Sequence, residues 1–204
     1  MFGRPLSMDD YLSARWISQP LRLFDFCLET DGAAALVVTS TERALDGPKP
    51  PALIRAVAQG SPKRPQPGIQ FPMLWRDSIT DGSAQAAART LYRRAGLGPE
   101  DIQVAQLYDC FSITVLLQLE DFGFCAKGEG GPFAASGAIV LGGRLPINTG
   151  GGHLSEGYIH GMGHIVEGVK QIRGESTSQV PGAEVCLVTS TALPPGSALI
   201  LKAA

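Results

Sequence analysis

Short apolar runs alternate with helix-forming stretches along this chain, and this alternation constrains its fold more than any other feature. Runs of five to eight apolar residues bounded by glycine, proline or polar residues are typical of buried strands. Strands that alternate with helices favour a layered α/β domain, and two closing strands joined at Pro194-Pro195-Gly196 add antiparallel pairing. The expected strands are Ala33–Thr39, Ala52–Ala58, Gln103–Leu107, Glu184–Thr191 and Ser197–Lys202.

Helices are expected between these strands. The clearest covers Gly82 to Ala95, where alanine and leucine recur on one face and Gly96 ends the pattern. The others are a short helix from Met8 capped by Ser7, a short one over Thr41–Gly47, one over Ile113–Glu120, a small one within residues 128–143 and one over Tyr158–Ile172. Residues 61–68 form a proline-rich loop, and Tyr11 and Tyr92 are expected to pack inside the domain.

Composition excludes several classes of protein. The chain has 204 residues and a formal net charge of −2, so it offers no basic face for nucleic acid. Its longest apolar run is shorter than the roughly 18 residues that a membrane span needs, and its start does not resemble a secretory signal. Four cysteines stand apart without a CxxC pair, which suits free thiols in a reducing cytoplasm.

Two loops carry the residues that point to chemistry. The first, Tyr108-Asp109-Cys110-Phe111-Ser112, follows a predicted strand and precedes a predicted helix. The second runs from Asn148 to Gly161 and holds three consecutive glycines, Gly150, Gly151 and Gly152, before Gly157 and Tyr158. Ligands of α/β proteins bind in such loops, beyond the carboxyl ends of strands, and glycines let the backbone approach a ligand closely. We therefore expect the two phenols to share one site.

The three histidines leave two interpretations open. His160 and His164 are four residues apart, so they would share a face of the predicted helix, and with His153 they could bind a metal ion. No acidic residue completes an HExxH pattern, so structural or catalytic roles are favoured and no metal is expected. A phenol with a pKa of about 10 needs a cationic or hydrogen-bonding neighbour to act as a base, and His153, His160 or His164 could supply it.

Residues 31–204 resemble the C-terminal half of thiolases. The match rests on Asp31-Gly32-Ala33-Ala34-Ala35, the Tyr108 loop, the Asn148–Gly161 segment and the closing hairpin, and is closest to the sterol-carrier (lipid-transfer) branch. The resemblance implies a βαβαβαββ unit with a mixed sheet and helices on both faces. Residues 1–30 are then a linker segment, and the N-terminal thiolase half, with its nucleophilic cysteine, is absent and must come in cis or in trans.

Departures from the thiolase pattern indicate different chemistry. Tyr108 stands where thiolases have Asn or His, and Gly157-Tyr158-Ile159 replaces their Gly-His-Pro. Ser190 begins the stretch where degradative thiolases have an acid–base cysteine. This double-tyrosine pattern resembles the thiolase-like aldolases of bacterial steroid side-chain degradation. The resemblance implies a carbon–carbon lyase that splits a β-hydroxyacyl-CoA, a steroid side-chain thioester, into a ketone and a short acyl-CoA such as propionyl-CoA.

Roles and partners complete these expectations. Tyr158 is assigned as the base, because a helix N-terminus and nearby histidines would favour its phenolate, and Tyr108 as the donor to the enolate, or the reverse. Asp109 would orient the first loop, with His153 and His160 beside the phenols. Substrate contacts are expected from Gly150, Gly151, Gly152, Gly157 and Ser190. No cofactor is expected, because CoA is part of the substrate. The expected partners are a second copy through the thiolase fold and an OB-fold/zinc-ribbon protein.

Two alternatives remain open from sequence. The chain could be the C-terminal domain of a sterol-carrier-type thiolase (an acyl-CoA acyltransferase) with unusual oxyanion donors, or a non-catalytic thiolase-like scaffold subunit. Lys63, Arg64 and Arg76 could contact CoA phosphates, although solvated surface charge is the simpler interpretation.

Overall fold

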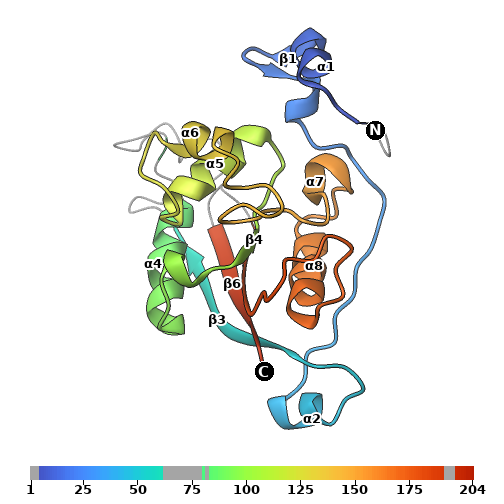
Figure 1. Cartoon of the computed structure of the whole chain (residues 1–204), viewed down its shortest axis with the longest axis vertical. Coiled ribbons are helices and arrows are strands. Elements are labelled where there is room, and N and C mark those ends of the chain that lie inside the picture. Colours follow the sequence, from blue (N-terminus) through green and yellow to red (C-terminus); the bar gives the residue numbers. More distant parts are fainter. Residues whose placement is uncertain (1–4, 62–79, 81–82, 191–195) are drawn as a thin grey trace.

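A four-stranded mixed sheet forms the centre of the protein (Figure 1). The computed structural model describes residues 5–61, 80, 83–190 and 196–204. The strands lie in the order β3-β6-β5-β4; the first two pairs are antiparallel, and β4 runs parallel to β5. Their bounds are β3 (Ala52–Gly60), β4 (Val104–Gln106), β5 (Val185–Thr189) and β6 (Gly196–Ala203).

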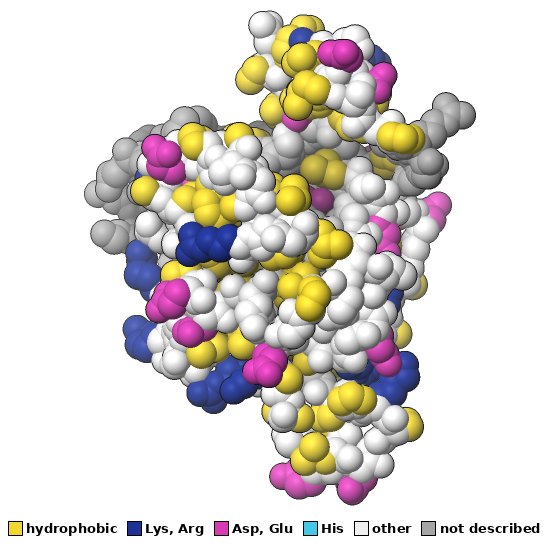
Figure 2. All heavy atoms as spheres, viewed as in Figure 1, with side chains coloured by type: hydrophobic (Ala, Val, Ile, Leu, Met, Phe, Trp, Pro, Cys, Tyr) yellow, Lys and Arg dark blue, Asp and Glu magenta, His cyan; other side chains and the backbone are white. Residues whose placement is uncertain are grey.

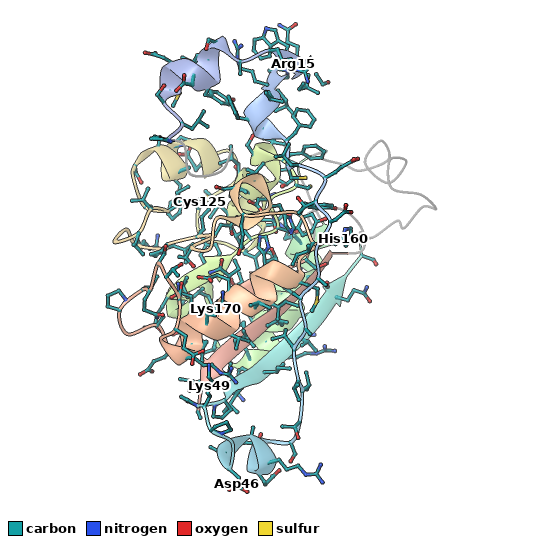
Figure 3. The ribbon with its side chains drawn as sticks, turned by 90° about the vertical axis from the view of Figure 1, so that its right-hand side faces the viewer. Arg15, Asp46, Lys49, Cys125, His160 and Lys170 are labelled. Atoms are coloured by element: carbon teal, nitrogen blue, oxygen red, sulfur yellow. The ribbon has the colours of Figure 1, made fainter. Side chains whose placement is uncertain are left out.

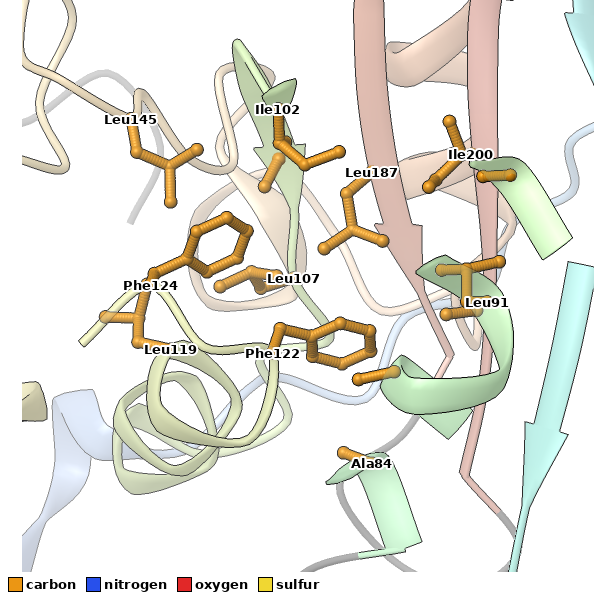
Figure 4. Packing of buried hydrophobic residues seen from close by; sticks show 14 of the residues in the cluster. Ala84, Leu91, Ile102, Leu107, Leu119, Phe122, Phe124, Leu145, Leu187 and Ile200 are labelled. Carbon is orange, nitrogen blue, oxygen red and sulfur yellow. The ribbon is translucent and has the colours of Figure 1, made fainter. Parts of the chain in front are cut away.

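Helices cover both faces of this sheet, as the sequence predicted. On one face, α4 (Ser83–Ala95) and α5 (Ser112–Asp121) close the larger core, in which Leu91, Leu107, Phe122 and Leu187 are almost fully buried (Figure 4). On the other face lies α8 (Met162–Arg173), whose apolar side chains pack on a smaller cluster from β4, β5 and β6. Every residue of β5 is buried, as expected for a strand with a helix on each side.

The α8 face is only partly covered. Helix α8 lies mainly over β4, β5 and β6 and touches β3 little. Ile54 and Val57, which point from β3 toward that face, are each 51% exposed. Described residues therefore leave an apolar edge of this face open to solvent.

The N-terminal elements project from the body of the domain (Figure 1). They are α1 (Met8–Ser13), β1 (Trp16–Ser18), β2 (Leu21–Arg22) and the 3-10 helix η1 (Leu23–Asp25). Hydrophobic side chains gather on this projection (Figure 2), among them Met8, which is 69% exposed. Asp25 joins the projection to the body, because its buried carboxylate accepts hydrogen bonds from Tyr11 and from Ser112 at the start of α5.

Other short elements complete the described chain, and several match the expected positions. Ser7 caps α1 in a capping box, and the predicted short helices appear as α2 and α6. Tyr92 packs as expected and donates a hydrogen bond to the Phe122 carbonyl. The bounds are α2 (Thr41–Leu45), η2 (Pro99–Asp101), α6 (Gly130–Ala135) and α7 (Gly152–Ser155).

The predicted buried strand over Ala33–Thr39 is wrong for this chain. The segment has no regular secondary structure and runs along the outside of the domain, with Val37 95% and Val38 76% exposed (Figure 1). Apolar alternation produces a strand only where a neighbouring strand pairs with it. None of the described strands pairs with this segment.

The predicted helix over Tyr158–Ile172 begins four residues late, at Met162. Gly161, at φ +87°, occupies the position before the first helical residue, and His160, at φ +53°, is also left-handed. These backbone angles are incompatible with a continuous helix. Tyr158 and His160 therefore lie in the turn between α7 and α8, and His160 does not share a helical face with His164.

A single parallel bridge extends the sheet beyond β4. Ile147 pairs in parallel with Ala105 of β4, through hydrogen bonds from the Ala105 amide to Pro146 and from the Asn148 amide to Ala105. This pairing brings the residues after Ile147 to the carboxyl end of β4, beside Tyr108.

Some predictions lie outside the described residues. They concern Lys63, Arg64, Arg76, most of the loop over residues 61–68 and the turn at Pro194-Pro195. The antiparallel pairing of the two strands that flank this turn is confirmed. No helix in the described part of the chain has the length and apolar character needed to cross a bilayer.

Gly168 sets how closely α8 approaches the sheet, and this contact gives a stability prediction. A Cβ at position 168 would lie 2.8 Å from a Val188 methyl and 3.1 Å from a Leu201 methyl. We expect Gly168→Ala to lower the free energy of unfolding by about 1–3 kcal/mol, because overpacking outweighs the higher helix propensity of alanine. Urea denaturation measures the change.

Gly163→Ala in the same helix is the matched control. A Cβ there would meet Ile159 only at 3.7 Å, an ordinary contact, so this variant should be neutral or stabilised. Equal stability of the two variants would contradict the packing explanation.

Candidate functional site

Two loops meet at the carboxyl end of β4, and Asn148 joins them. Its side-chain Oδ1 accepts from the Leu107 amide at 2.7 Å, and its Nδ2 donates to the Leu107 carbonyl at 2.9 Å. Its backbone is left-handed, at φ +46°. The Asn148 side chain thus continues the pairing with β4 while the main chain turns away into the glycine loop.

Buried polar groups fix the backbone of Tyr108, which is 4% exposed. Its amide donates to Thr189 Oγ1 at 2.9 Å, and its carbonyl accepts from Gln118 Nε2 at 2.7 Å and from Thr114 Oγ1 at 3.1 Å. Thr189 in turn donates to Gln118 Oε1. Strand β5 and helix α5 together therefore set the direction of the Tyr108 ring.

The Asp109 carboxylate is the centre of the site. It accepts hydrogen bonds from the amides of His153 at 2.8 Å and Leu154 at 3.2 Å, and its Oδ1 lies 3.0 Å from His164 Nε2. Burial alone would raise the pKa of Asp109, but the bond and charge of His164 and the two amides outweigh burial, so the pKa is lowered. An ionised carboxylate therefore ties the first loop to α7 and α8.

The glycine loop approaches carboxylates of the protein itself. A Cβ on Gly152, which has φ +61°, would collide with Asp109 Oδ2, and a Cβ on Gly150 would lie 3.2 Å from the Glu167 carboxylate. Gly150, Gly152 and Gly157 line a crevice of about 10 Å³, which holds one water molecule at most. Gly151, at φ +101°, precedes α7. Substrate contact by these four glycines stays a prediction.

His153 is buried as a neutral imidazole. Its Nε2 accepts a hydrogen bond from the Gly161 amide at 3.0 Å, while its Nδ1 lies 3.5 Å from Asp109 Oδ1 without a hydrogen-bond partner. Burial, followed by the charges of His164 and His160, lowers the pKa of His153 to about 4, against the attraction of Asp109. The ring also packs edge-on against Tyr108 and Tyr158, with centroids 4.7 Å away in each case.

Asp109, His153 and His164 form a cluster in the described residues whose geometry could hold a metal ion. Its atoms already have partners, however: His153 Nε2 is bonded to Gly161, and His164 Nε2 to Asp109 and to the Leu107 carbonyl. A cation would have to replace these bonds. His160 lies outside this cluster, so the metal site imagined from the helical spacing of His160 and His164 does not form.

The two phenols meet in one hydrogen-bonded chain. The hydroxyls of Tyr108 and Tyr158 are 2.7 Å apart, and the Tyr158 hydroxyl lies 2.8 Å from His160 Nδ1. Burial, then the bond to Tyr158, raises the pKa of Tyr108 above the ordinary value for tyrosine. Tyr108 is therefore a neutral phenol that can donate a proton and that would be a strong base after losing one.

A cavity of about 540 Å³ opens beside this chain of groups. His160 and Ser190 line it, together with Arg94 and apolar residues of β3, β5, β6 and α8. Figure 3 places His160 at the end of α8 opposite Lys170. The expectation that the two phenols point into one cavity is not met here, because neither tyrosine is among the described residues that line it. The two hydroxyls instead touch each other, and His160, which is bonded to Tyr158, lines the cavity.

Several residues of the site had no recognisable signal in the sequence. Asn148, Thr189 and Gln118 act through hydrogen bonds to backbone atoms 41, 81 and 10 residues away. Thr30 similarly accepts from the Tyr158 amide at 3.2 Å. Asn148 alone had a local hint, since asparagine tolerates the left-handed region and often precedes a glycine turn.

The neutral state of His153 predicts a pH dependence of stability. The unfolded chain protonates this histidine near pH 6.5, whereas the folded chain resists protonation until about pH 4. Stability contributed by this group is present above pH 6.5 and is lost as the pH falls toward 4, by about 2 kcal/mol between pH 7 and pH 5. The pKa of Asp109 lies below its ordinary value of 3.8, so Asp109 does not contribute to the change in stability between pH 7 and pH 5.

His153→Gln keeps a group that can accept from the Gly161 amide but cannot titrate. Urea denaturation at pH 7 and pH 5 should show the extra loss of stability in the wild-type protein and a smaller loss in the variant. An identical pH dependence for both would contradict a neutral, buried His153.

Comparison with known proteins identifies the family. The family model described as "Thiolase C-terminal domain-like" matches residues 73–201. The 17-hydroxy-3-oxo-4-pregnene-20-carboxyl-CoA lyase of Mycobacterium tuberculosis is 49% identical and matches 98% of this chain. The steroid side-chain-cleaving aldolase of Thermomonospora curvata is 47% identical over 99% of the chain.

A solved structure agrees with these matches. The structure titled "Ltp2-ChsH2(DUF35) aldolase" superposes with a TM-score of 0.93 at 48% identity, covering 98% of this chain and 52% of that one. This chain spans 51% of the length of each of the two curated relatives. The sequence resemblance, the mixed sheet with helices on both faces and these matches agree: the chain belongs to the thiolase C-terminal domain-like family.

Proposed function

We propose that the protein carrying this chain is a retro-aldolase, a carbon–carbon lyase that cleaves a β-hydroxyacyl-CoA. The substrate would be a steroid side-chain CoA thioester, and the products a ketone and a short acyl-CoA such as propionyl-CoA. The observation that carries the proposal is the direct contact of the Tyr108 and Tyr158 hydroxyls, 2.7 Å apart. The names of the two relatives with 47–49% identity support the substrate class.

The reaction needs two proton transfers at neighbouring atoms. A base removes the proton of the β-hydroxyl group, and the oxygen lone pair forms the ketone carbonyl as the Cα–Cβ bond breaks. The electron pair of that bond passes to Cα and the thioester carbonyl as an enolate, which an acid then protonates at Cα. Two phenols in contact can serve the two ends of this sequence.

Different surroundings assign different roles to the phenols. Tyr108 is buried, and its raised pKa keeps it protonated, so it suits the acid that donates to the enolate. Tyr158 is less buried and contacts an imidazole nitrogen that can accept its proton, so it suits the base. Asp109 positions both loops, and His153 packs between the rings as a neutral group.

The remaining site predictions stay within this proposal. Ser190 lines the 540 Å³ cavity beside His160, where a substrate could reach it. The four loop glycines would shape the acyl-CoA site through the backbone. The reaction is acid–base chemistry, and we propose no metal or other cofactor, with CoA entering as part of the substrate in the cytoplasm.

Thiolase chemistry is the weaker candidate for this chain. A thiolase forms a thioester on a cysteine thiolate, but burial raises the pKa of Cys110 to about 11 and also raises the pKa of Cys27 and Cys125. Cys186 is fully buried, and its pKa is raised as well. These four thiols are protonated at neutral pH and are poor nucleophiles.

We propose further that a second half of the thiolase fold, in cis or in trans, covers the open surfaces of this chain. The relatives are about twice as long, and Val37, Val38 and Ile54 expose apolar area that a partner would bury. A second copy and an OB-fold/zinc-ribbon protein are the further partners proposed, and the two-component title of the solved aldolase supports the latter.

The hydroxyl groups can be removed singly to test the reaction. We expect Tyr108→Phe and Tyr158→Phe, in the complete protein with its partners, to lose about 10²–10⁴-fold in kcat for cleavage of a β-hydroxyacyl-CoA. Ring packing is kept in both variants, so folding should be normal. Release of the short acyl-CoA, followed by chromatography, measures the rate.

Tyr92→Phe is the control, because it removes a phenol hydroxyl that bonds only the Phe122 carbonyl within the core. Its cleavage rate should match that of the wild-type protein. Wild-type rates in both Tyr108→Phe and Tyr158→Phe would refute the two-phenol mechanism.

The isolated chain should associate or fold poorly without its other half. Exposed apolar surface costs about 25 cal/mol per Å², and the open face and the Ala33–Thr39 segment remain exposed in the monomer. Sedimentation velocity should show self-association at micromolar concentration. A monodisperse monomer with one sharp unfolding transition would speak against a missing half.

A further inference from the structure

We propose that Tyr108, Tyr158 and His160 form a proton relay in which His160 is the terminal acceptor and resets the site after each turnover. This inference rests on the proposed retro-aldol function and goes beyond it, because it assigns the group that receives the Tyr158 proton. His160 receives its proton through Tyr158 and is therefore assigned as a relay residue.

The direction of the relay follows from the number of donors and acceptors. Within the described chain, the Tyr108 hydroxyl has the Tyr158 oxygen as its hydrogen-bond partner, so we infer that Tyr108 donates to Tyr158. The Tyr158 proton then points to His160 Nδ1 at 2.8 Å, which accepts it when the neutral ring carries its hydrogen on Nε2. The reverse direction would leave the hydrogen of the buried Tyr108 without an acceptor.

The other two imidazoles are engaged elsewhere. His153 Nε2 accepts from the Gly161 amide, and His164 Nε2 lies between the Leu107 carbonyl and Asp109. His160 thus supplies the imidazole nitrogen that bonds a phenol in this site. The sequence gives no such distinction, since all three histidines lie within twelve residues of one another.

The turn that presents His160 is held in an uncommon conformation. His160 has φ +53°, in the left-handed region that few non-glycine residues adopt, with asparagine, aspartate and histidine the most frequent among them. The next amide, at Gly161, is fixed by the buried His153 ring. Such a conformation persists only where surrounding contacts enforce it, and it is common at functional sites. Here it aims Nδ1 at the Tyr158 hydroxyl.

Solvent exposure of the side chains increases along the relay from Tyr108 to His160. Tyr108 is buried, Tyr158 is half-buried, and His160 is exposed at the wall of the 540 Å³ cavity. The ionisable groups around His160 are Tyr158 and Tyr108 in ring contact, the neutral His153, and Arg94 on the same cavity wall. An imidazole in this position can exchange protons with the cavity, whereas Tyr108 cannot.

The proton balance closes without a proton from solution. The substrate hydroxyl proton passes to Tyr158 while the Tyr158 proton passes to His160, which becomes an imidazolium. Tyr108 gives its proton to Cα of the enolate and becomes a phenolate. Tyr108 then recovers a proton from Tyr158, and Tyr158 recovers one from His160. The net result is transfer of one proton from the substrate oxygen to Cα.

Two substitutions at position 160 test the relay in the complete protein with its partners. His160→Asn tolerates the left-handed backbone and can still accept a hydrogen bond, but it cannot take a proton. His160→Gly also suits the backbone and leaves space beside the cavity for added imidazole. We expect both to lower kcat by about 10–100-fold with folding intact.

Rescue and pH dependence separate proton transfer from structure. Imidazole should restore His160→Gly at least fivefold and should not restore His160→Asn or Tyr158→Phe. Wild-type kcat should fall on the acid side, where the imidazole is already protonated, and His160→Asn should lose that acid limb. Failure of rescue together with an unchanged acid limb in His160→Asn would overturn the relay.

A measurement without turnover keeps the relay distinct from the proposed function. In protein labelled with ¹⁵N-histidine, two-bond ¹H–¹⁵N spectra should show His160 Nδ1 as the unprotonated, hydrogen-bonded nitrogen, and Tyr158→Phe should shift that signal. A protonated Nδ1 would overturn the relay. A wild-type protein that does not cleave a β-hydroxyacyl-CoA would refute the proposed function, whereas cleavage unaffected by His160→Asn would refute only the relay.

Discussion

The rest of the site depends on one buried carboxylate. Asp109 accepts the first free amides of α7 and faces His164 of α8, so it fixes two later elements from a loop that follows β4. Tyr108 directly precedes Asp109, and α7 leads into the turn that carries Tyr158. Because the carboxylate stays ionised, the helix start and the imidazole keep a charge-assisted partner even though all are buried. Removing this charge would free both loops at once, and the distance between the phenols would no longer be determined.

The two tyrosines of the site are the same residue type in different surroundings. Tyr108 is enclosed by the sheet, α5 and the His153 ring, and the surrounding dielectric disfavours its phenolate. Tyr158 lies in a turn, against an imidazole nitrogen and less enclosed. Burial raises the pKa of Tyr108, and the backbone arrangement is therefore what suits this phenol to the acid role proposed above.

Sequence patterns predicted the frame of this domain and the identity of the phenols, but not their contacts. The strands over Ala52–Ala58 and Glu184–Thr191 are apolar runs bounded by polar residues, glycine or proline, and the helix ending at Ala95 carries an amphipathic period. Ala33–Thr39 carries the same pattern and forms no strand, because pairing requires a neighbour that this chain does not supply among its described strands. The start of α8 was misplaced because Tyr158 and Ile159 fit a helix well, whereas the left-handed His160 and Gly161 prevent it. The bond of Thr189 to a backbone atom 81 residues away leaves no local pattern at all, and Asn148 leaves only the hint that asparagine tolerates a left-handed backbone.

The attachment of the N-terminal projection has a mechanical consequence. Asp25 accepts a hydrogen bond from Ser112, the first residue of α5. Phe26 and Cys27 pair with Phe111 and Cys110. The projection is therefore attached to the same short loop that carries Tyr108. The exposed apolar side chains of the projection lie far from the sheet, and the projection is attached to the domain at that loop (Figure 1). A protein that grasps the projection would pull on the backbone between Tyr108 and Ser112. Occupancy of a distant surface could thereby be transmitted to the spacing of two hydroxyl groups, without any change in the core between them.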